Sequence, residues 1–203
     1  NKKTMTTKKQ KTETIEIPKV EIAMVKFRVR GITPLIVSRF SEKAKQMMLE
    51  KQMMKASAGK EAKNPVEQYE NSLYKFADGK RTGFPAVGFK SAMVRGGQQL
   101  GFKMTILRGR FHVMADEGDL VEIHGEPHMR EDMVRLANGV ADVRFRGEYH
   151  AGWEAELTIQ YFKNAISAEQ LAQLLSVAGF SCGIGEWRPE KSNSGSYGLF
   201  ELC

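Results

Sequence analysis

The C-terminal part of the chain alternates a strand, a helix and a strand, and no other part constrains the fold as strongly. Residues 153–162 alternate apolar and polar side chains, which predicts a β-strand with one buried face. Ser167 begins a capping box that predicts a helix over residues 167–178, and Gly179 is expected to end that helix. A short apolar run at residues 199–202 predicts the closing strand.

Three earlier segments share the period of two that is typical of strands. Residues 23–30, 107–113 and 143–150 alternate apolar side chains with Lys, Arg or His. Residues 120–123 are expected to be the hairpin partner of residues 107–113. Apolar residues at helical spacing predict a helix over residues 85–100. The order of elements is then βαββαβ, which is the ferredoxin-like or RNA-recognition-like plan of an α+β domain.

Two segments are longer than a minimal domain of this plan needs, and we interpret them as insertions at about residues 31–83 and 125–150. The first is expected to contain a Met-rich helix that begins at Ser41 and a short helix opened by Pro65. The second is expected to contain a short helix within residues 125–140. Both insertions belong to one domain.

The composition favours a polyanionic partner. The chain has 203 residues and a net charge of +7, which favours nucleic acid first and an anionic membrane surface second. Residues 1–14 are rich in Lys and Thr and are expected to be a flexible basic arm, so residues 15–203 form the single domain. Residues 56–65 are also expected to be flexible.

Cysteine usage and hydropathy give expectations about the compartment and cofactors. Cys182 and Cys203 cannot form a disulfide framework or a zinc quartet, and no apolar run is long enough to span a membrane. We therefore expect a cytoplasmic protein with no membrane, cofactor or metal.

His124 and His128 are four residues apart, but Gly125 and Pro127 oppose a helix between them, so a helical zinc pair is not expected.

Basic residues at alternate positions of the predicted strands would place positive charge on one side of a sheet if the strand registers agree. The residues predicted to bind nucleic acid on these strands are Lys26, Arg28, Arg30, Arg108, Arg110, Arg144 and Arg146. In the glycine-rich segment near the C-terminus, Trp187 offers a surface for stacking on a base, while Arg188 and Lys191 suit phosphate. A packed Trp187 in an ordinary loop is the alternative.

Two segments resemble a known family. Residues 84–95 (FPAVGFKSAMVR) resemble the helix opening of the RAMP (repeat-associated mysterious protein) superfamily, and residues 179–202 are similar to its C-terminal glycine-rich loop and strand. The resemblance implies a modified RNA-recognition-like fold, as in the backbone subunits of CRISPR effector complexes, which polymerise along a guide RNA. It also implies that Lys90, Ser91 and Arg95 lie near the nucleic-acid backbone. Departures from the family pattern indicate a divergent relative, consistent with a phage origin.

The leading hypothesis is a non-enzymatic protein that binds single-stranded RNA or DNA and self-associates along the strand as a homo-oligomer or filament. The residues predicted to mediate self-association are Met47, Met48, Met53 and Met54, because methionine makes adaptable contact surfaces. A metal-independent endoribonuclease is the second hypothesis, since some RAMP relatives cleave RNA with a histidine, and His112 or His150 would then be catalytic. A structural or interaction protein that uses the Met-rich helix is the third.

Overall fold

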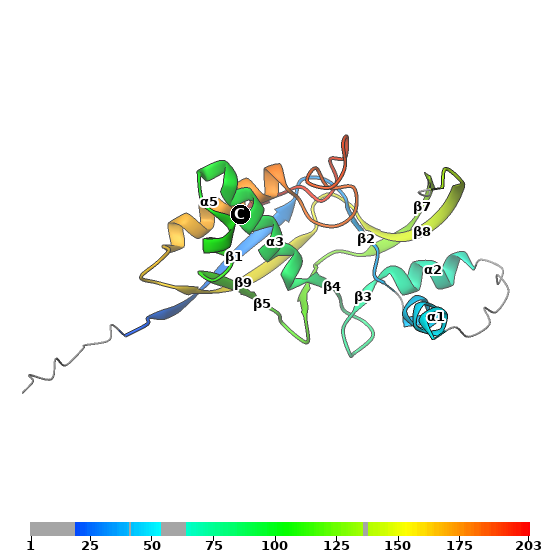
Figure 1. Ribbon diagram of the computed structural model, residues 1–203, viewed down its shortest axis with the longest axis horizontal. Helices are drawn as coiled ribbons and strands as arrows, with labels where there is room; N and C mark the ends of the chain where they lie inside the picture. Colours follow the sequence, from blue (N-terminus) through cyan, green and yellow to red (C-terminus); the bar gives the residue numbers. More distant parts are fainter. Residues whose placement is uncertain (1–18, 41, 54–63, 136–137) are drawn as a thin grey trace, which may run out of the picture.

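The strands that pair around β1 form the largest sheet, and every neighbouring pair in it is antiparallel (Figure 1). The computed structural model describes residues 19–40, 42–53, 64–135 and 138–203. In spatial order the strands of this sheet are β10 (Phe200–Leu202), β1 (Ile22–Gly31), β9 (Glu154–Phe162) and β5 (Phe111–Met114). The strands predicted at the C-terminus and in residues 23–30 are therefore confirmed, and the protein is an α+β protein.

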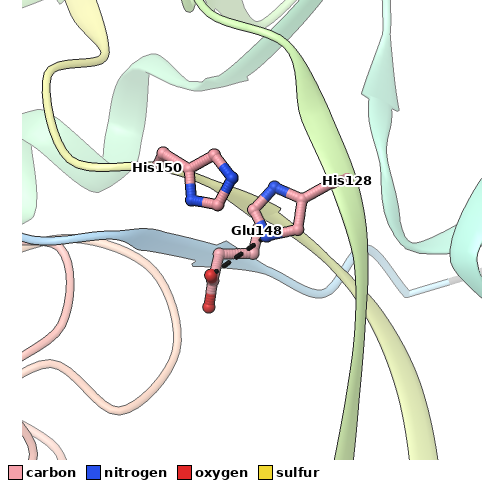
Figure 2. Close-up of side chains that lie close together, drawn as sticks. All are labelled: His128, Glu148 and His150. Carbon is pink, nitrogen blue, oxygen red and sulfur yellow. Dashed lines mark hydrogen bonds and ion pairs between the residues drawn. The ribbon is translucent and has the colours of Figure 1, made fainter.

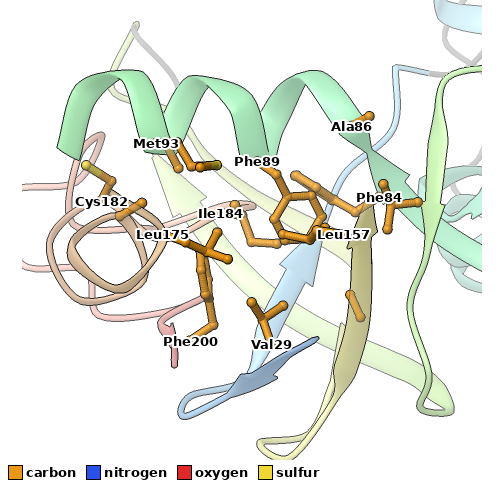
Figure 3. Packing of buried hydrophobic residues seen from close by; sticks show 14 of the residues in the cluster. Val29, Phe84, Ala86, Phe89, Met93, Leu157, Leu175, Cys182, Ile184 and Phe200 are labelled. Carbon is orange, nitrogen blue, oxygen red and sulfur yellow. The ribbon is translucent and has the colours of Figure 1, made fainter. Parts of the chain in front are cut away.

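Two helices, α3 (Ala86–Gly96) and α5 (Ala168–Ser181), pack on one face of this sheet and form the core with it (Figure 3). Phe89 of α3 and Leu175 of α5 are fully buried. The sheet contributes Val29, Leu157 and Phe200 to the same cluster. A 3₁₀ turn, η1 (Gly97–Leu100), continues α3, which confirms the helix predicted over residues 85–100.

Helix α5 begins as predicted but ends later. The Ser167 hydroxyl accepts a hydrogen bond from the Gln170 amide at 3.2 Å, and the Gln170 side chain accepts one from the Ser167 amide, so the capping box is confirmed. The expectation that Gly179 ends the helix is wrong, because α5 continues to Ser181. Gly179 is instead a point of close approach, since an added Cβ would lie 1.9 Å from the carbonyl oxygen of Phe200.

A long two-stranded ribbon dominates the second sheet. Its strands β7 (Pro127–Arg135) and β8 (Ala141–Tyr149) pair over their whole length, and β2 (Leu35–Val37) pairs with the end of β8. We call β7 and β8 together the ribbon. The helix expected within residues 125–140 is therefore wrong for the described residues, because this segment is strand β7.

Helix α2 (Pro65–Ser72) packs on the ribbon and has the start signal expected for it. The Asn64 side chain caps its first amides, and Pro65 occupies its first turn, where a missing N–H has no cost. The Tyr69 hydroxyl donates a hydrogen bond to the carbonyl oxygen of Pro127 at 2.8 Å, which fixes the helix to β7.

The third sheet corrects two expectations about residues 107–123. It consists of β3 (Tyr74–Lys75), β4 (Thr82–Pro85) and β6 (Leu120–Glu122), so β6 pairs with β4 and not with β5. Val121 of β6 is fully buried opposite Phe84, and this burial outweighs a local hairpin with β5. Residues 107–110 are also not strand, because Leu107 ends the short helix α4 (Met104–Leu107) and a turn follows it.

Helix α1 (Glu42–Gln52) lies near α2, at the end of the molecule away from α5 (Figure 1). Met47, Met48 and Met53 are each more than half exposed, so these residues do not belong to the core. Met54, Ser41, the basic arm at 1–14 and most of the loop at 56–65 lie outside the described residues. No helix within the described ranges is long and apolar enough to cross a membrane.

Candidate nucleic-acid interface

The outer β1 face, formed by Lys26, Arg28 and Arg30, is exposed as predicted, but carboxylates of β9 lie opposite its cations. The strand register pairs Arg28 with Glu156 and Arg30 with Glu154. Lys26 Nζ lies 2.6 Å from Glu156 Oε1, and this hydrogen bond raises the pKa of Lys26 and lowers the pKa of Glu156. One of the three cations of this face is therefore paired within the protein, and carboxylates of β9 lie opposite the other two.

An open groove on the same side of the sheet has mixed charge. It has a volume of about 430 Å³, and carboxylates of four residues meet one guanidinium and one imidazole in its wall. The charged residues that line it are Arg28, Asp116, Glu122, His124, Glu154 and Glu156. The expected alignment of three basic strands on one side is wrong, because β8 belongs to another sheet and Arg108 and Arg110 precede β5.

A second basic region, which we call the β5 edge, consists of Lys90, Arg108, Arg110 and His112. Lys90 Nζ reaches from α3 to within 3.0 Å of His112 Nδ1 on β5. Burial lowers the pKa of Lys90, and no carboxylate acts against this effect. Among the described residues, no ion pair joins Lys90, Arg108 or Arg110 to a carboxylate. The β5 edge therefore has positive charge that the described part of the protein leaves uncompensated.

The two segments that resemble the RAMP superfamily lie side by side, although 83 residues separate them in sequence. Ser91 of α3 and Arg188 of the C-terminal loop line one small groove of about 80 Å³. The Glu190 carboxylate joins the segments, since its oxygens lie 2.7 Å from Arg95 Nε and 3.0 Å from Arg188 Nε. Lys191 follows in the same loop and is exposed. The sequence did not identify Glu190 as the partner of these two arginines.

Trp187 is half-buried against two arginines of the ribbon. Its ring centroid lies 4.5 Å from the Arg146 guanidinium carbon and 5.5 Å from that of Arg130. Trp187 also has a φ of 53°, a left-handed conformation that a residue with a Cβ rarely adopts. The surrounding contacts therefore hold the indole in place on the ribbon, and part of its stacking surface is used within the protein.

Arg146 is not on an exposed face, contrary to the expectation from the alternating pattern. Its side chain is 4% exposed, and its Nη2 lies 2.5 Å from Asp132 Oδ2. Asp132 also accepts hydrogen bonds from Arg130 Nε, and Arg130 Nη1 donates to Glu148. The reason for the burial is that Asp132 and Trp187 cover this guanidinium. Arg144, two residues earlier on β8, remains exposed.

Two histidines lie together at the base of the ribbon. The rings of His128 and His150 are stacked, with centroids 3.9 Å apart and an angle of 20° between their planes (Figure 2). His128 Nε2 lies 3.1 Å from Glu148 Oε1, because β7 and β8 pair these two residues directly. The sequence did not predict this cluster, since it depends on the register of a strand that was expected to be a helix.

Comparison with known proteins gives a likeness of fold only. No family model matches the chain, and no curated protein matches its sequence. The crystal structure of Cmr6 from Pyrococcus furiosus is 8% identical, with a TM-score of 0.42, over 91% of this chain and 100% of that chain. This score is too low to support an argument.

A second solved structure is the cryo-EM structure of the type III-B Cmr-beta bound to cognate target RNA. One of its chains has a TM-score of 0.51 and 12% identity, and the match covers 90% of this chain and 59% of that chain. At this identity the match concerns the fold alone. The fold of this chain is therefore similar to that of one chain of this complex, in agreement with the resemblance that the two sequence segments indicated.

Proposed function

We propose that the protein binds single-stranded nucleic acid without cleaving it and self-associates along the strand. Its α+β fold is similar to that of a chain from a complex bound to RNA. The sheet order β10-β1-β9-β5 and the chain order strand, helix, strand, strand, helix, strand support a modified ferredoxin-like domain. Residues 31–83 and 125–150 are then its insertions.

The β5 edge is the observation that carries this proposal. The half-buried ammonium of Lys90 lacks a carboxylate partner among the described residues, and Arg108 and Arg110 also lack one. A phosphate bound here would supply the missing negative charge and would raise the pKa of Lys90 again. The Ala86 amide already donates to the carbonyl oxygen of Asp119, and the next amides of α3, which no side chain caps, would face a neighbouring phosphate.

Self-association is assigned to helix α1. Met47, Met48 and Leu49 of α1 and Met53, which follows it, are each more than half exposed, which leaves apolar surface open to solvent. A neighbouring copy bound to the same strand would cover it. Contacts that run from one copy to the next without closing produce a filament.

Salt titration of RNA and DNA binding tests the first part of the proposal. The affinity for a long single strand should fall with added salt, with a log–log slope of roughly 0.7 for each phosphate contacted. Light scattering tests the second part, because the mass of the complex should increase with strand length. Changing Met47, Met48 and Met53 to Ser should abolish this increase and preserve binding of one copy to a short oligonucleotide. Absence of binding at low salt contradicts the whole proposal.

The contact between Lys90 and His112 supports a second candidate, a metal-independent endoribonuclease. A lysine 3.0 Å from His112 Nδ1 donates to that nitrogen and leaves the proton on Nε2, so the ring would donate a hydrogen bond to a phosphate oxygen and stabilise the phosphorane. Incubation of labelled RNA in EDTA separates the two candidates. Cuts that disappear in His112→Ala favour the nuclease, whereas intact RNA favours the binding protein.

A further inference from the structure

His128, Glu148 and His150 bring three possible metal ligands together on the polar face of the ribbon. One ligand atom from each residue lies within 4.8 Å of the others, and no other group of this kind occurs among the described residues. His128 comes from β7, whereas Glu148 lies on β8 and His150 follows the last residue of that strand. Figure 2 shows the carboxylate of Glu148 below the two stacked rings.

We propose that these three side chains bind one divalent transition-metal ion, with zinc as the best match. Two imidazoles and one carboxylate form a common donor set for zinc. Zinc bonds of about 2.0–2.1 Å at a tetrahedral angle place two ligand atoms about 3.3 Å apart. His128 Nε2 and Glu148 Oε1 are already 3.1 Å apart, so the ion replaces the hydrogen bond between them with little movement.

The third ligand requires one side chain to turn. An ion lies near the plane of each imidazole that binds it, and two rings stacked 3.9 Å apart cannot both point at one ion. His150 is exposed and lies beyond the end of β8, so rotation about its side-chain bonds brings a nitrogen toward the pair. The same exposure leaves the fourth position open to water.

Arg130 and Asp132 hold the carboxylate of Glu148 in place. Its second oxygen accepts a hydrogen bond from Arg130, and Asp132 binds the other edge of that guanidinium. Outer partners of this kind orient a ligating carboxylate. Arg130 and Arg146 balance the charges of Asp132 and Glu148, so direct ligation and not net charge supplies the affinity for the ion.

Binding of the metal ion would link the ribbon to the connection that leads into the main sheet. Residues 150–153 connect β8 to β9, and the Gly152 amide donates a hydrogen bond to the carbonyl oxygen of Gly31 at 2.8 Å. An ion held by both His128 and His150 therefore joins β7 to this connection. The inference does not depend on nucleic-acid binding.

Metal titration of untagged, EDTA-treated protein tests the site. A Cys203→Ser background removes an exposed thiol that would compete for the ion. We expect one equivalent of Zn²⁺ to bind and to raise Tm, and Co²⁺ to give the visible absorption of a tetrahedral site. His150→Ala should lose affinity by at least about tenfold, and its Tm without metal should not change because His150 is exposed. His128→Gln should show the same loss.

His124→Ala is the matched control. His124 is also exposed and lies 3.8 Å from a carboxylate oxygen of Glu122, but it is outside the cluster. Its removal should leave stoichiometry and affinity unchanged. The inference is overturned if the parent protein binds no equivalent of Zn²⁺ or Co²⁺, or if His150→Ala and His128→Gln bind the ion as tightly as His124→Ala does.

Discussion

The outer β1 face and the β5 edge contain the same kinds of residue but differ in what lies beside them. On β1, Lys26 forms an ion pair with Glu156, and Arg28 lies opposite the same carboxylate. At the β5 edge, Lys90 meets the ring of His112 and no carboxylate. A basic pattern in one strand therefore identifies a charged face, whereas the neighbouring strand decides whether that charge is available to a ligand.

Arg146 extends this comparison to a buried cation that has a carboxylate partner within the protein. Arg146→Ala should destabilise the protein by about 1.5–3 kcal/mol, because it removes one of the two guanidinium partners of the buried carboxylate of Asp132. Arg144→Ala on the same strand should change the free energy of unfolding by no more than about 0.5 kcal/mol, since Arg144 is exposed. Urea denaturation of both variants measures the difference. Similar values would show that Arg146 is not buried as described.

Removing the carboxylates of β9 should make the outer β1 face resemble the β5 edge. Glu154→Gln with Glu156→Gln leaves Lys26, Arg28 and Arg30 without the carboxylates that lie beside them on β9. If each of these three cations then contacts one phosphate, the log–log salt slope should steepen by roughly 2. Salt titration of single-stranded RNA binding provides the measurement. An unchanged slope would mean that the β1 face is not accessible to the strand.

Lys26 and Lys90 should have small and opposite effects on stability in the absence of nucleic acid. Burial lowers the pKa of Lys90, so the charged form of this side chain destabilises the fold at any pH below the ordinary lysine pKa of 10.5. Lys90→Met should therefore raise Tm at neutral pH. Glu156 raises the pKa of Lys26, so the charged form of Lys26 stabilises the fold at neutral pH, and this stabilisation is lost when the pH rises above the raised pKa. Lys26→Met should therefore lower Tm at neutral pH.

Calorimetry at neutral pH and again above pH 10.5 measures both variants. The two Tm differences should diminish at the higher pH, because both lysines then approach the neutral state in the folded and unfolded chains. Shifts of the same sign at neutral pH would contradict the contrast between the two regions.

The sequence predicted the elements whose signals are local and complete. Helix α5 has its own capping box, and β9 alternates over its whole length, so both were found. Strand β7 was missed because Met129 and Met133 are four residues apart, a spacing that fits one face of a helix and also one face of a strand. Arg130 and Asp132, which lie between them, form the more buried face of β7, and this reverses the usual pattern.

The candidate site was less predictable because charge compensation acts between distant segments. Glu154 and Glu156 are visible in the sequence, but only the register of β1 and β9 places them beside the basic residues. Pairing between Glu190 and Arg95 and the contact between Lys90 and His112 likewise join residues that no local pattern connects. The positions of basic residues were therefore predictable, whereas their partners were not.

The most direct test compares two triple variants in one salt titration of single-stranded RNA binding. One changes Lys90, Arg108 and Arg110 to Ala, and the other changes Lys26, Arg28 and Arg30 to Ala. The first should reduce the magnitude of the log–log slope by roughly 2, as expected for the loss of three phosphate contacts, and the second should change it much less. Equal reductions, or a larger reduction in the second variant, would contradict the assignment of binding to the β5 edge.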